Sequence, residues 1–409
     1  MKKEVFAVFR VVLYAWEAAF GRAGKAGAHR RSRFWGWPKG SGKTLFLMKI
    51  VVLLVYLLLA IGGQTYVSWR TWQLLPAILP LRVAVVGMMT AAFLTFFLVM
   101  GGVGEKFSLP VGTFLYEVGM SWPFVLLYLA LFYGLADLLM LVHVLPREWL
   151  RGSWPGTLGV LAVMTVLFGY GYLRFERKVR VPLTLQSGGK VARPLRVVMV
   201  SDLHLGYHNR RADLRRWLQM IMREKPDALL IGGDIIDRAV RPVRLEQSAE
   251  EFRSLGIPVY AVLGNHDHYA GVESVVHFCA DAGITLLRDS VAMLGDVAIV
   301  GRDDRTNGAR KPLAKLMAGV DKGRYVVLLD HQPHRLDEAQ RAGVDFEFAG
   351  HTHRGQVWPI SWVTDAIYEK SHGELTKGDT RYWVSSGLGI WGGKFRIGTQ
   401  SEYVVATIR

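Results

Sequence analysis

Residues 196–204 read RVVMVSDLH, so an apolar run ends in an aspartate and a histidine two positions apart. The run RVVMV predicts a buried β-strand. Further apolar runs follow at residues 228–231, 259–263, 297–300, 325–329 and 346–348, and amphipathic stretches such as the one carrying Leu214, Trp217, Leu218 and Ile221 lie between them. This alternation predicts an α/β domain over residues 195–409. The closing runs YWVSS and EYVVATI have no helix between them, so part of the sheet system is expected to be antiparallel.

Five of these predicted strands are followed by Asp, His or Asn, residue types that commonly bind metals in proteins. The motifs are Asp202-Leu203-His204, Gly232-Gly233-Asp234, Gly264-Asn265-His266-Asp267, Asp330-His331-Gln332-Pro333 and Gly350-His351-Thr352-His353. The carboxyl ends of strands in an open α/β sheet border one crevice, so these loops are expected to meet. In an extended segment, side chains at i and i+2 point the same way, which would aim both members of a DxH or HxH pair into one cavity.

The chemistry of these side chains favours a pair of metal ions. Carboxylate, amide and imidazole ligands without a thiolate suit Mn²⁺, with Fe and Zn²⁺ as alternatives, and disfavour Ca²⁺. Seven such residues are too many for one tetrahedral ion, whereas two ions sharing a carboxylate would use them all. Such a pair suits phosphoester hydrolysis. A single DxH or HxH is more often a chance occurrence than a metal site, but five motifs in order are hard to attribute to packing alone.

The series DLH, GGD, GNHD, HQP and GHTH resembles the motif series of the calcineurin-like metallophosphoesterase family. The tail SSGLGIWGGKFRIG at residues 385–398, with GRDD at 301–304, is similar to a membrane-associated bacterial branch of that family. The resemblance covers about residues 195–409. It implies a sandwich of two packed β-sheets flanked by helices.

Carried over residue by residue, the resemblance also implies a site. Asp202, His204 and His353 would bind one divalent ion. Asn265, His331 and His351 would bind the other, and Asp234 would bridge the two. A hydroxide between the ions would attack phosphorus, and His266 would act on the leaving group.

Four neighbouring residues are candidates for supporting roles. Asp237 and Asp303 are expected to support the site from behind the ligands, with N-capping or loop roles as the alternative. Asp267 is expected either to orient His266 or to cap a helix. Arg354 stands where much of this branch has glycine, and it is a candidate for contacting a substrate phosphate.

The first half of the chain predicts a membrane part. Apolar segments at residues 45–66, 83–103, 124–144 and 157–172 are long enough to cross a bilayer, which requires about 20 helical residues. Ten Lys or Arg residues lie in residues 1–44 and seven in 174–196, but each predicted outer loop has two. This bias predicts cytoplasmic termini. The predicted organisation is a basic amphipathic segment (1–44), about four transmembrane helices (45–174), a basic linker (175–194) and the catalytic domain (195–409).

The net charge of +16 comes largely from the segments that flank the apolar block. That distribution favours a membrane surface over nucleic acid, which is not expected as a partner. Within the third apolar segment, Asp137 is expected to pair with a neighbouring helix or to lie near the headgroups, and a polar pathway is the alternative.

Together these observations predict an integral protein of a bacterial inner or plasma membrane with a cytoplasmic metal-dependent phosphoesterase domain. The expected substrate is a phosphoester or pyrophosphate, lipid-linked or amphiphilic, met at the bilayer surface. The alternative is a transporter, sensor or scaffold that uses the metal domain as a regulatory or binding module. The sequence is silent on the oligomeric state.

Overall fold

The structure is a computed structural model that describes residues 42–409, without the side chains of residues 42–49, 52 and 53. The predicted amphipathic segment therefore lies, up to residue 41, outside the described residues. The chain divides into two compact units. Of the described residues, the first contains 42–93 and Phe124–Val160, and the second contains Leu94–Pro123 and Leu161–Arg409.

The apolar half of the chain is helical throughout. Its helices are α2 (Gly42–Leu74), α3 (Leu79–Met100), η1 (Val103–Lys106), α4 (Leu109–Leu141), η2 (Arg147–Leu150) and α5 (Trp154–Glu176). Among the described residues, α3, α4 and α5 are long and apolar enough to cross a membrane. They contain most of the last three predicted segments, and α2 contains the first. A fourth span along α2 stays a prediction.

Asp137 in α4 pairs with α2. Its Oδ1 lies 2.8 Å from Arg70 Nη2, and its Oδ2 accepts a hydrogen bond of 2.6 Å from the Tyr66 hydroxyl. Arg70 lies within α2 and not in the outer loop where the sequence placed it. A half-buried carboxylate with a cationic partner has a structural explanation, so Asp137 offers no support for a polar pathway.

Two six-stranded sheets form the centre of the second unit. The first sheet has the order β1 (Lys178–Leu185), β12 (Ser401–Ile408), β2 (Leu195–Val200), β3 (Ala228–Ile231), β4 (Val259–Ala261) and β5 (Thr285–Leu286). The second has the order β10 (Gly373–Lys377), β11 (Thr380–Val384), β9 (Phe346–Ala349), β8 (Tyr325–Leu329), β7 (Val297–Gly301) and β6 (Ser290–Leu294). The strands around each sheet centre are parallel, which aligns their carboxyl ends.

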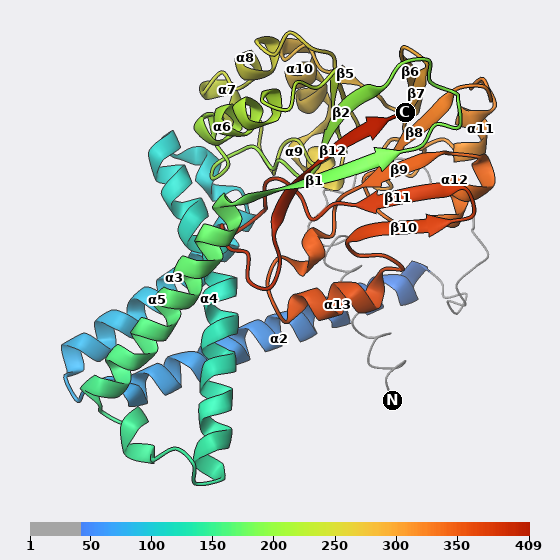
Figure 1. The fold of residues 1–409 in the computed structure, drawn as a ribbon. Helices are drawn as coiled ribbons and strands as arrows, with labels where there is room; N and C mark the ends of the chain where they lie inside the picture. Colours follow the sequence, from blue (N-terminus) through green and yellow to red (C-terminus); the bar gives the residue numbers. More distant parts are fainter. Residues whose placement is uncertain (1–41) are drawn as a thin grey trace. The chain divides into compact units, whose positions relative to one another are not determined.

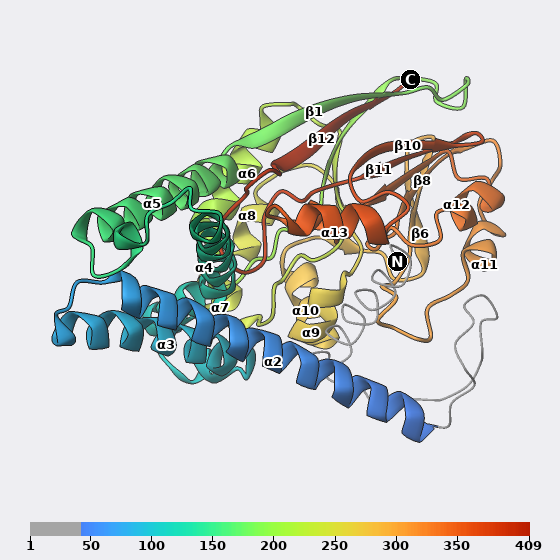
Figure 2. The ribbon, with the colours of Figure 1, turned by 90° about the horizontal axis from the view of Figure 1, so that it is seen from below.

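All eight apolar runs noted in the sequence form strands. The expected antiparallel pairing occurs between β12 and β2, whereas β11 runs parallel to β9 and antiparallel to β10. Strand β1 lies in the segment 175–194, where the sequence predicted only a linker, and it runs beside β12 (Figures 1 and 2). Its first residues are half-buried and basic, which conceals the strand pattern.

A continuous apolar core lies between the two sheets. Met199 of β2, Val327 of β8 and Phe346 of β9 are among its fully buried members. Helices α6 (Arg211–Met222), α8 (Ala249–Arg253) and α10 (Val272–Asp281) cover the outer face of the first sheet. Helices α11 (Leu313–Met317) and α12 (Asp337–Ala342) cover that of the second (Figure 1). The predicted sandwich of two helix-flanked sheets is confirmed.

The connection between α3 and α4 packs on this sandwich. Val99, Tyr116 and Met120 form a small buried cluster with Tyr207 and Ala239. Tyr207 follows β2, and Ala239 precedes α7 (Arg241–Leu245). The end of α3 and the first half of α4 therefore form one compact unit with the sheets, although the sequence placed them wholly within the membrane part.

Candidate metal centre

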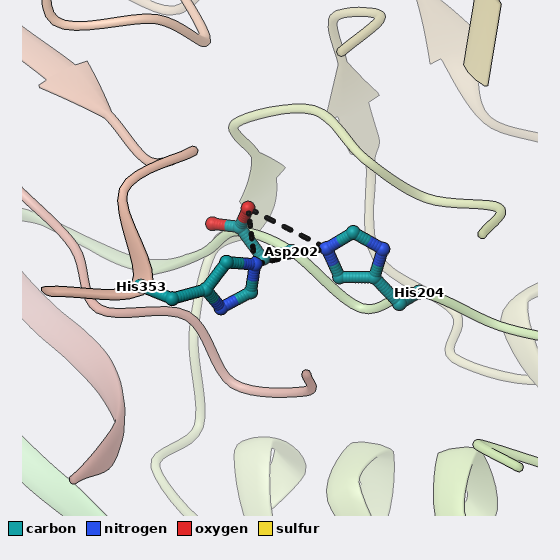
Figure 3. A group of neighbouring side chains, drawn as sticks. All are labelled: Asp202, His204 and His353. Carbon is teal, nitrogen blue, oxygen red and sulfur yellow. Dashed lines mark hydrogen bonds and ion pairs between the residues drawn. The ribbon is translucent and has the colours of Figure 1, made fainter. Parts of the chain in front are cut away.

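One group of three side chains comes from the loops after β2 and β9. His353 Nε2 lies 3.4 Å and His204 Nε2 lies 3.7 Å from Asp202 Oδ1. The two imidazole Nε2 atoms are 3.0 Å apart. Figure 3 shows all three side chains directed at one point. Their ligand atoms lie within 4.8 Å of one another, which is the spacing that a shared cation requires.

A second group comes from the loops after β3, β8 and β9. Asp234, His331 and His351 bring their ligand atoms within the same 4.8 Å. His331 Nε2 lies 3.2 Å from Asp234 Oδ2, and His351 Nδ1 lies 2.8 Å from the side-chain oxygen of Asn265. Asp234 Oδ2 is also 3.6 Å from His204 Nε2 in the first group. Asp234 thus lies between the groups, where a bridging ligand would have to be.

The backbone that presents these residues is not extended, contrary to the argument made from the sequence. Asp202, His204, Asp234, His351 and His353 all have positive φ angles, between 45° and 71°. Such conformations are costly for residues other than glycine and persist at functional sites where the surrounding structure enforces them. Asp202 and His204 converge through this left-handed turn, while His351 and His353 diverge into different groups.

Gly350 makes room for the first group. A Cβ atom at this position would overlap Ser201 Oγ and Asp202 Oδ2. Backbone N–H groups near it also serve the site, because the His351 N–H donates to Asp202 Oδ1 at 3.1 Å. The glycine before HTH is therefore required for close approach and not for a special φ angle.

We expect Gly350→Ala to lose metal and stability together. The added methyl must displace Asp202 or Ser201, and overpacking of this kind typically costs about 1–3 kcal/mol of unfolding free energy. Gly308→Ala is the matched control, because a Cβ there meets open space. Metal content per chain and Tm measure both variants. Wild-type metal content in Gly350→Ala would contradict this account of the loop.

The charge balance of the site fits cations. Asp202, Asp234 and Asp237 are all buried within this cluster. Burial by itself would lower the pKa of His204, but the carboxylates of Asp202 and Asp237 raise that pKa to about 10. His331 Nε2 is buried and faces the Asp234 carboxylate at 3.2 Å, without the geometry of a hydrogen bond. An excess of buried carboxylates with imidazole nitrogens aimed inward fits divalent ions such as Mn²⁺, Fe²⁺ or Zn²⁺.

Asp237 holds two histidines at once. Its Oδ1 accepts from His266 Nδ1 at 2.9 Å and lies 3.3 Å from His204 Nδ1. Burial opposes ionisation of Asp237, but these two contacts outweigh it and keep its pKa well below the usual value. Because Nδ1 of His266 is bound to Asp237, Nε2 is the nitrogen left for a substrate.

Asp267 does not take the orienting role considered for it. Its carboxylate accepts hydrogen bonds from the backbone N–H groups of Gly264, Ile235 and Ile236, at 2.8, 3.2 and 2.8 Å. These contacts cap α9 (Asn265–Ala270) and join it to the loop after β3. The capping alternative therefore describes Asp267, and Asp237 contacts His266 instead.

The two remaining candidates lie apart from both groups. Asp303 binds His268 Nε2 at 3.1 Å and Arg288 Nη2 at 3.0 Å, so it organises a loop and does not touch a predicted ligand. Arg354 is the middle residue of η3 (His353–Gly355) and lines a pocket of about 260 Å³ with Tyr368, Lys370 and His372. That position, next to His353 in sequence, suits a contact with a substrate.

Arg396 is a buried residue to which the sequence analysis assigned no role. Its Nη1 donates to the His353 carbonyl at 2.8 Å, and its Nη2 lies 3.4 Å from His353 Nδ1. The guanidinium thus holds both the backbone and the ring of one predicted ligand. The only signal in the sequence was its place in the tail SSGLGIWGGKFRIG.

Comparison with known families gives this arrangement a name. Residues 195–355 match the family model of the calcineurin-like phosphoesterases. This part of the chain is a calcineurin-like phosphoesterase domain. Members of that family are metal-dependent phosphoesterases, and the convergent carboxylates and imidazoles of this domain suit that chemistry.

The chain is similar in sequence to several proteins that are named as metallophosphoesterases. An uncharacterized metallophosphoesterase of Aquifex aeolicus is 28% identical over 248 residues, which cover 58% of this chain and 92% of that protein. One from Helicobacter pylori strain J99 is 26% identical over 254 residues, covering 58% and 66%. A Danio rerio protein named as a transmembrane protein with metallophosphoesterase domain is 29% identical over 273 residues, covering 61% and 62%. A solved dimetal phosphatase from Danio rerio is 12% identical with a TM-score of 0.32, covering 47% and 87%.

Proposed function

We propose that the protein is a membrane-anchored phosphohydrolase whose phosphoesterase domain uses two divalent ions. The observation that carries the proposal is the convergence of the loops after β2, β3, β4, β8 and β9 into adjoining groups of candidate ligands, with Asp234 3.2 Å from His331 and 3.6 Å from His204. A single structural metal would not require the second group. Separate packing roles would not require the costly backbone angles.

The position of each residue determines the role that we propose for it. Asp202, His204 and His353 would hold one ion, and Asn265, His331 and His351 the other, with Asp234 between them. When bound, such a pair lowers the pKa of a water molecule and neutralises phosphoryl oxygens. His266, held by Asp237, would donate its proton from Nε2 to the departing oxygen. This assignment balances the charge that develops as the phosphorus–oxygen bond breaks.

An amphiphilic substrate is supported by the surface around Arg354. Helix α13 (Ile360–Ile367) buries Ser361 and Thr364 but exposes Ile360 and Trp362, the latter to 65%. Its apolar face is thus turned outward, close in sequence to the pocket that contains Arg354. A phosphate group near Arg354 with an apolar chain along α13 would satisfy both features.

The membrane part supports a location at a bilayer surface. The α3–α4 connection and the end of α5 both belong to the unit that contains the catalytic domain, which supports placing both on the domain's side of a membrane. The Lys and Arg bias supports the cytoplasm as that side. A topology reporter fused after Arg409 tests on which side of the membrane the domain lies. A reporter that is active only on the external side would contradict the cytoplasmic location.

The test of function uses the full chain in detergent micelles, because the catalytic unit includes residues 94–123. We expect Mn²⁺-dependent cleavage of bis-p-nitrophenyl phosphate, and faster cleavage of a phosphorylated lipid than of its water-soluble headgroup. Asp202→Asn should abolish turnover. Stoichiometric metal without turnover on either substrate would favour a binding or regulatory module instead.

A further inference from the structure

A tyrosine from the apolar half of the chain reaches the carboxylate behind the catalytic histidine. Tyr116, in the first half of α4, donates a hydrogen bond from its hydroxyl to Asp237 Oδ2. Its ring lies nearly parallel to that of His208, with centroids 5.1 Å apart, and is stacked on Tyr207 at 5.7 Å. Only 3% of Tyr116 is exposed. The contact is therefore part of a packed interior and not a chance surface encounter.

The two carboxylate oxygens of Asp237 contact different residues. Oδ1 faces His266 Nδ1 and His204 Nδ1, while Oδ2 accepts from Tyr116. A carboxylate bound at one oxygen only can rotate about its Cβ–Cγ bond, since that terminal torsion is broad. The Tyr116 hydroxyl fixes the second oxygen, and so it fixes the plane in which the first oxygen meets the histidines.

Apolar packing holds α3 and α4 against the loops that contain Tyr207 and Ala239. The cluster of Val99, Tyr116, Met120, Tyr207 and Ala239 excludes water from the contact. Close approach is built in at Gly112, one turn before Tyr116, where a Cβ atom would lie 2.8 Å from the Tyr207 ring and 2.7 Å from the Gly104 carbonyl. The α3–α4 connection is thus shaped to fit the catalytic unit.

His208 completes the support from the other direction. It is buried, and its Nε2 lies 2.7 Å from the Ile390 carbonyl. Burial lowers its pKa to about 4, so near neutral pH it is an uncharged ring on which Tyr116 can stack. The stack therefore positions the hydroxyl without adding charge near Asp237.

We propose that Tyr116 is a positioning residue for the phosphohydrolase, acting through Asp237 on His266, so that the membrane hairpin α3–α4 completes the active site. This inference rests on the proposed function. It assigns the membrane part a role in the rate of the reaction in addition to anchoring. A bilayer or lipid that shifts this hairpin would change catalysis through one hydrogen bond.

The test is Tyr116→Phe in the full chain, which removes the hydroxyl and keeps the stacked ring. We expect kcat for diphenyl phosphate to fall about tenfold, because a hydrogen bond to a charged group is lost while His266 remains bound to Asp237. KM and metal content should stay at wild-type values. For bis-p-nitrophenyl phosphate the loss should be under twofold, since its leaving group scarcely needs a proton.

Tyr207→Phe is the matched control. It removes a hydroxyl from the same stack, and that hydroxyl interacts with Arg241 and not with Asp237. We expect wild-type kcat on both substrates. Equal losses on both substrates in Tyr116→Phe, or an unchanged kcat for diphenyl phosphate, would overturn the inference while leaving the proposed function intact. An inactive wild-type chain with both ions bound would overturn the function and the inference together.

Discussion

His266→Gln is expected to keep the metal content of the wild type and to lose a factor of about 10² to 10⁴ in kcat, the range that a general acid contributes. The loss is expected because Nδ1 of His266 is bound to Asp237 and Nε2 alone can supply the proton. Glutamine retains the size and polarity of the site but donates no proton. Steady-state kinetics on diphenyl phosphate, with metal analysis of the same sample, measures both quantities.

His268→Gln is the control for this prediction. His268 lies on the same short helix, but it binds Asp303 and not Asp237. It should retain wild-type kcat. A kcat within threefold of wild type in His266→Gln would mean that another group protonates the leaving oxygen, and the role given to His266 would be withdrawn.

Asp234→Asn is expected to have the largest effect of all, because it removes the carboxylate that is proposed to bridge the two ions. Asp234 Oδ2 faces His331 at 3.2 Å and His204 at 3.6 Å, and its Oδ1 accepts from the His266 backbone N–H at 2.8 Å. The amide can reproduce the geometry but not the charge. Mutating a residue that only hydrogen-bonds to a metal ligand typically lowers metal affinity by roughly 10- to 100-fold. Asp234 is proposed to be a ligand itself, so the loss of affinity in Asp234→Asn should be larger. Calorimetric titration with Mn²⁺ measures the change.

Asp303→Asn provides the comparison. It removes another buried carboxylate, but one that binds Arg288 and His268 outside both ligand groups. Its metal affinity should match the wild type. If Asp234→Asn lost only one of two ions and kept the other at full affinity, Asp234 would belong to a single ion and the bridge would be wrong.

The sequence was informative wherever short-range pattern determines structure. Runs such as VVMV and YVVLL are buried on both faces and rich in valine, and their shortness favours strands over helices. Parallel neighbours in one sheet must place their carboxyl ends together, so the approach of the loops after β2 and β3, which carry Asp202 and Asp234, could be expected from strand order. The meeting of Asp202 with His353 joins two different sheets, and strand order does not predict it. Strands β5 and β6 were missed because one is two residues long and the other lies half-exposed at a sheet edge.

Contacts between distant parts of the chain could not be predicted in this way. Tyr116 and Asp237 are 121 positions apart and meet only because α4 begins 15 residues before the predicted apolar segment. The sequence could not show whether Asp237 or Asp267 contacts His266. The path of the loop after β3 decides this, because it brings Asp237 to His266 and its own backbone N–H groups to Asp267. The positive φ angles at Asp202 and His204 could not be predicted from the residue types, because the surrounding fold imposes them.

The measurement that tests the central claim most directly is electron paramagnetic resonance of the full chain loaded with Mn²⁺, together with metal counting. The account predicts two Mn²⁺ per chain with an exchange-coupled spectrum, because Asp234 lies between the two ligand groups. A single uncoupled Mn²⁺ per chain at saturation, with full activity, would contradict it.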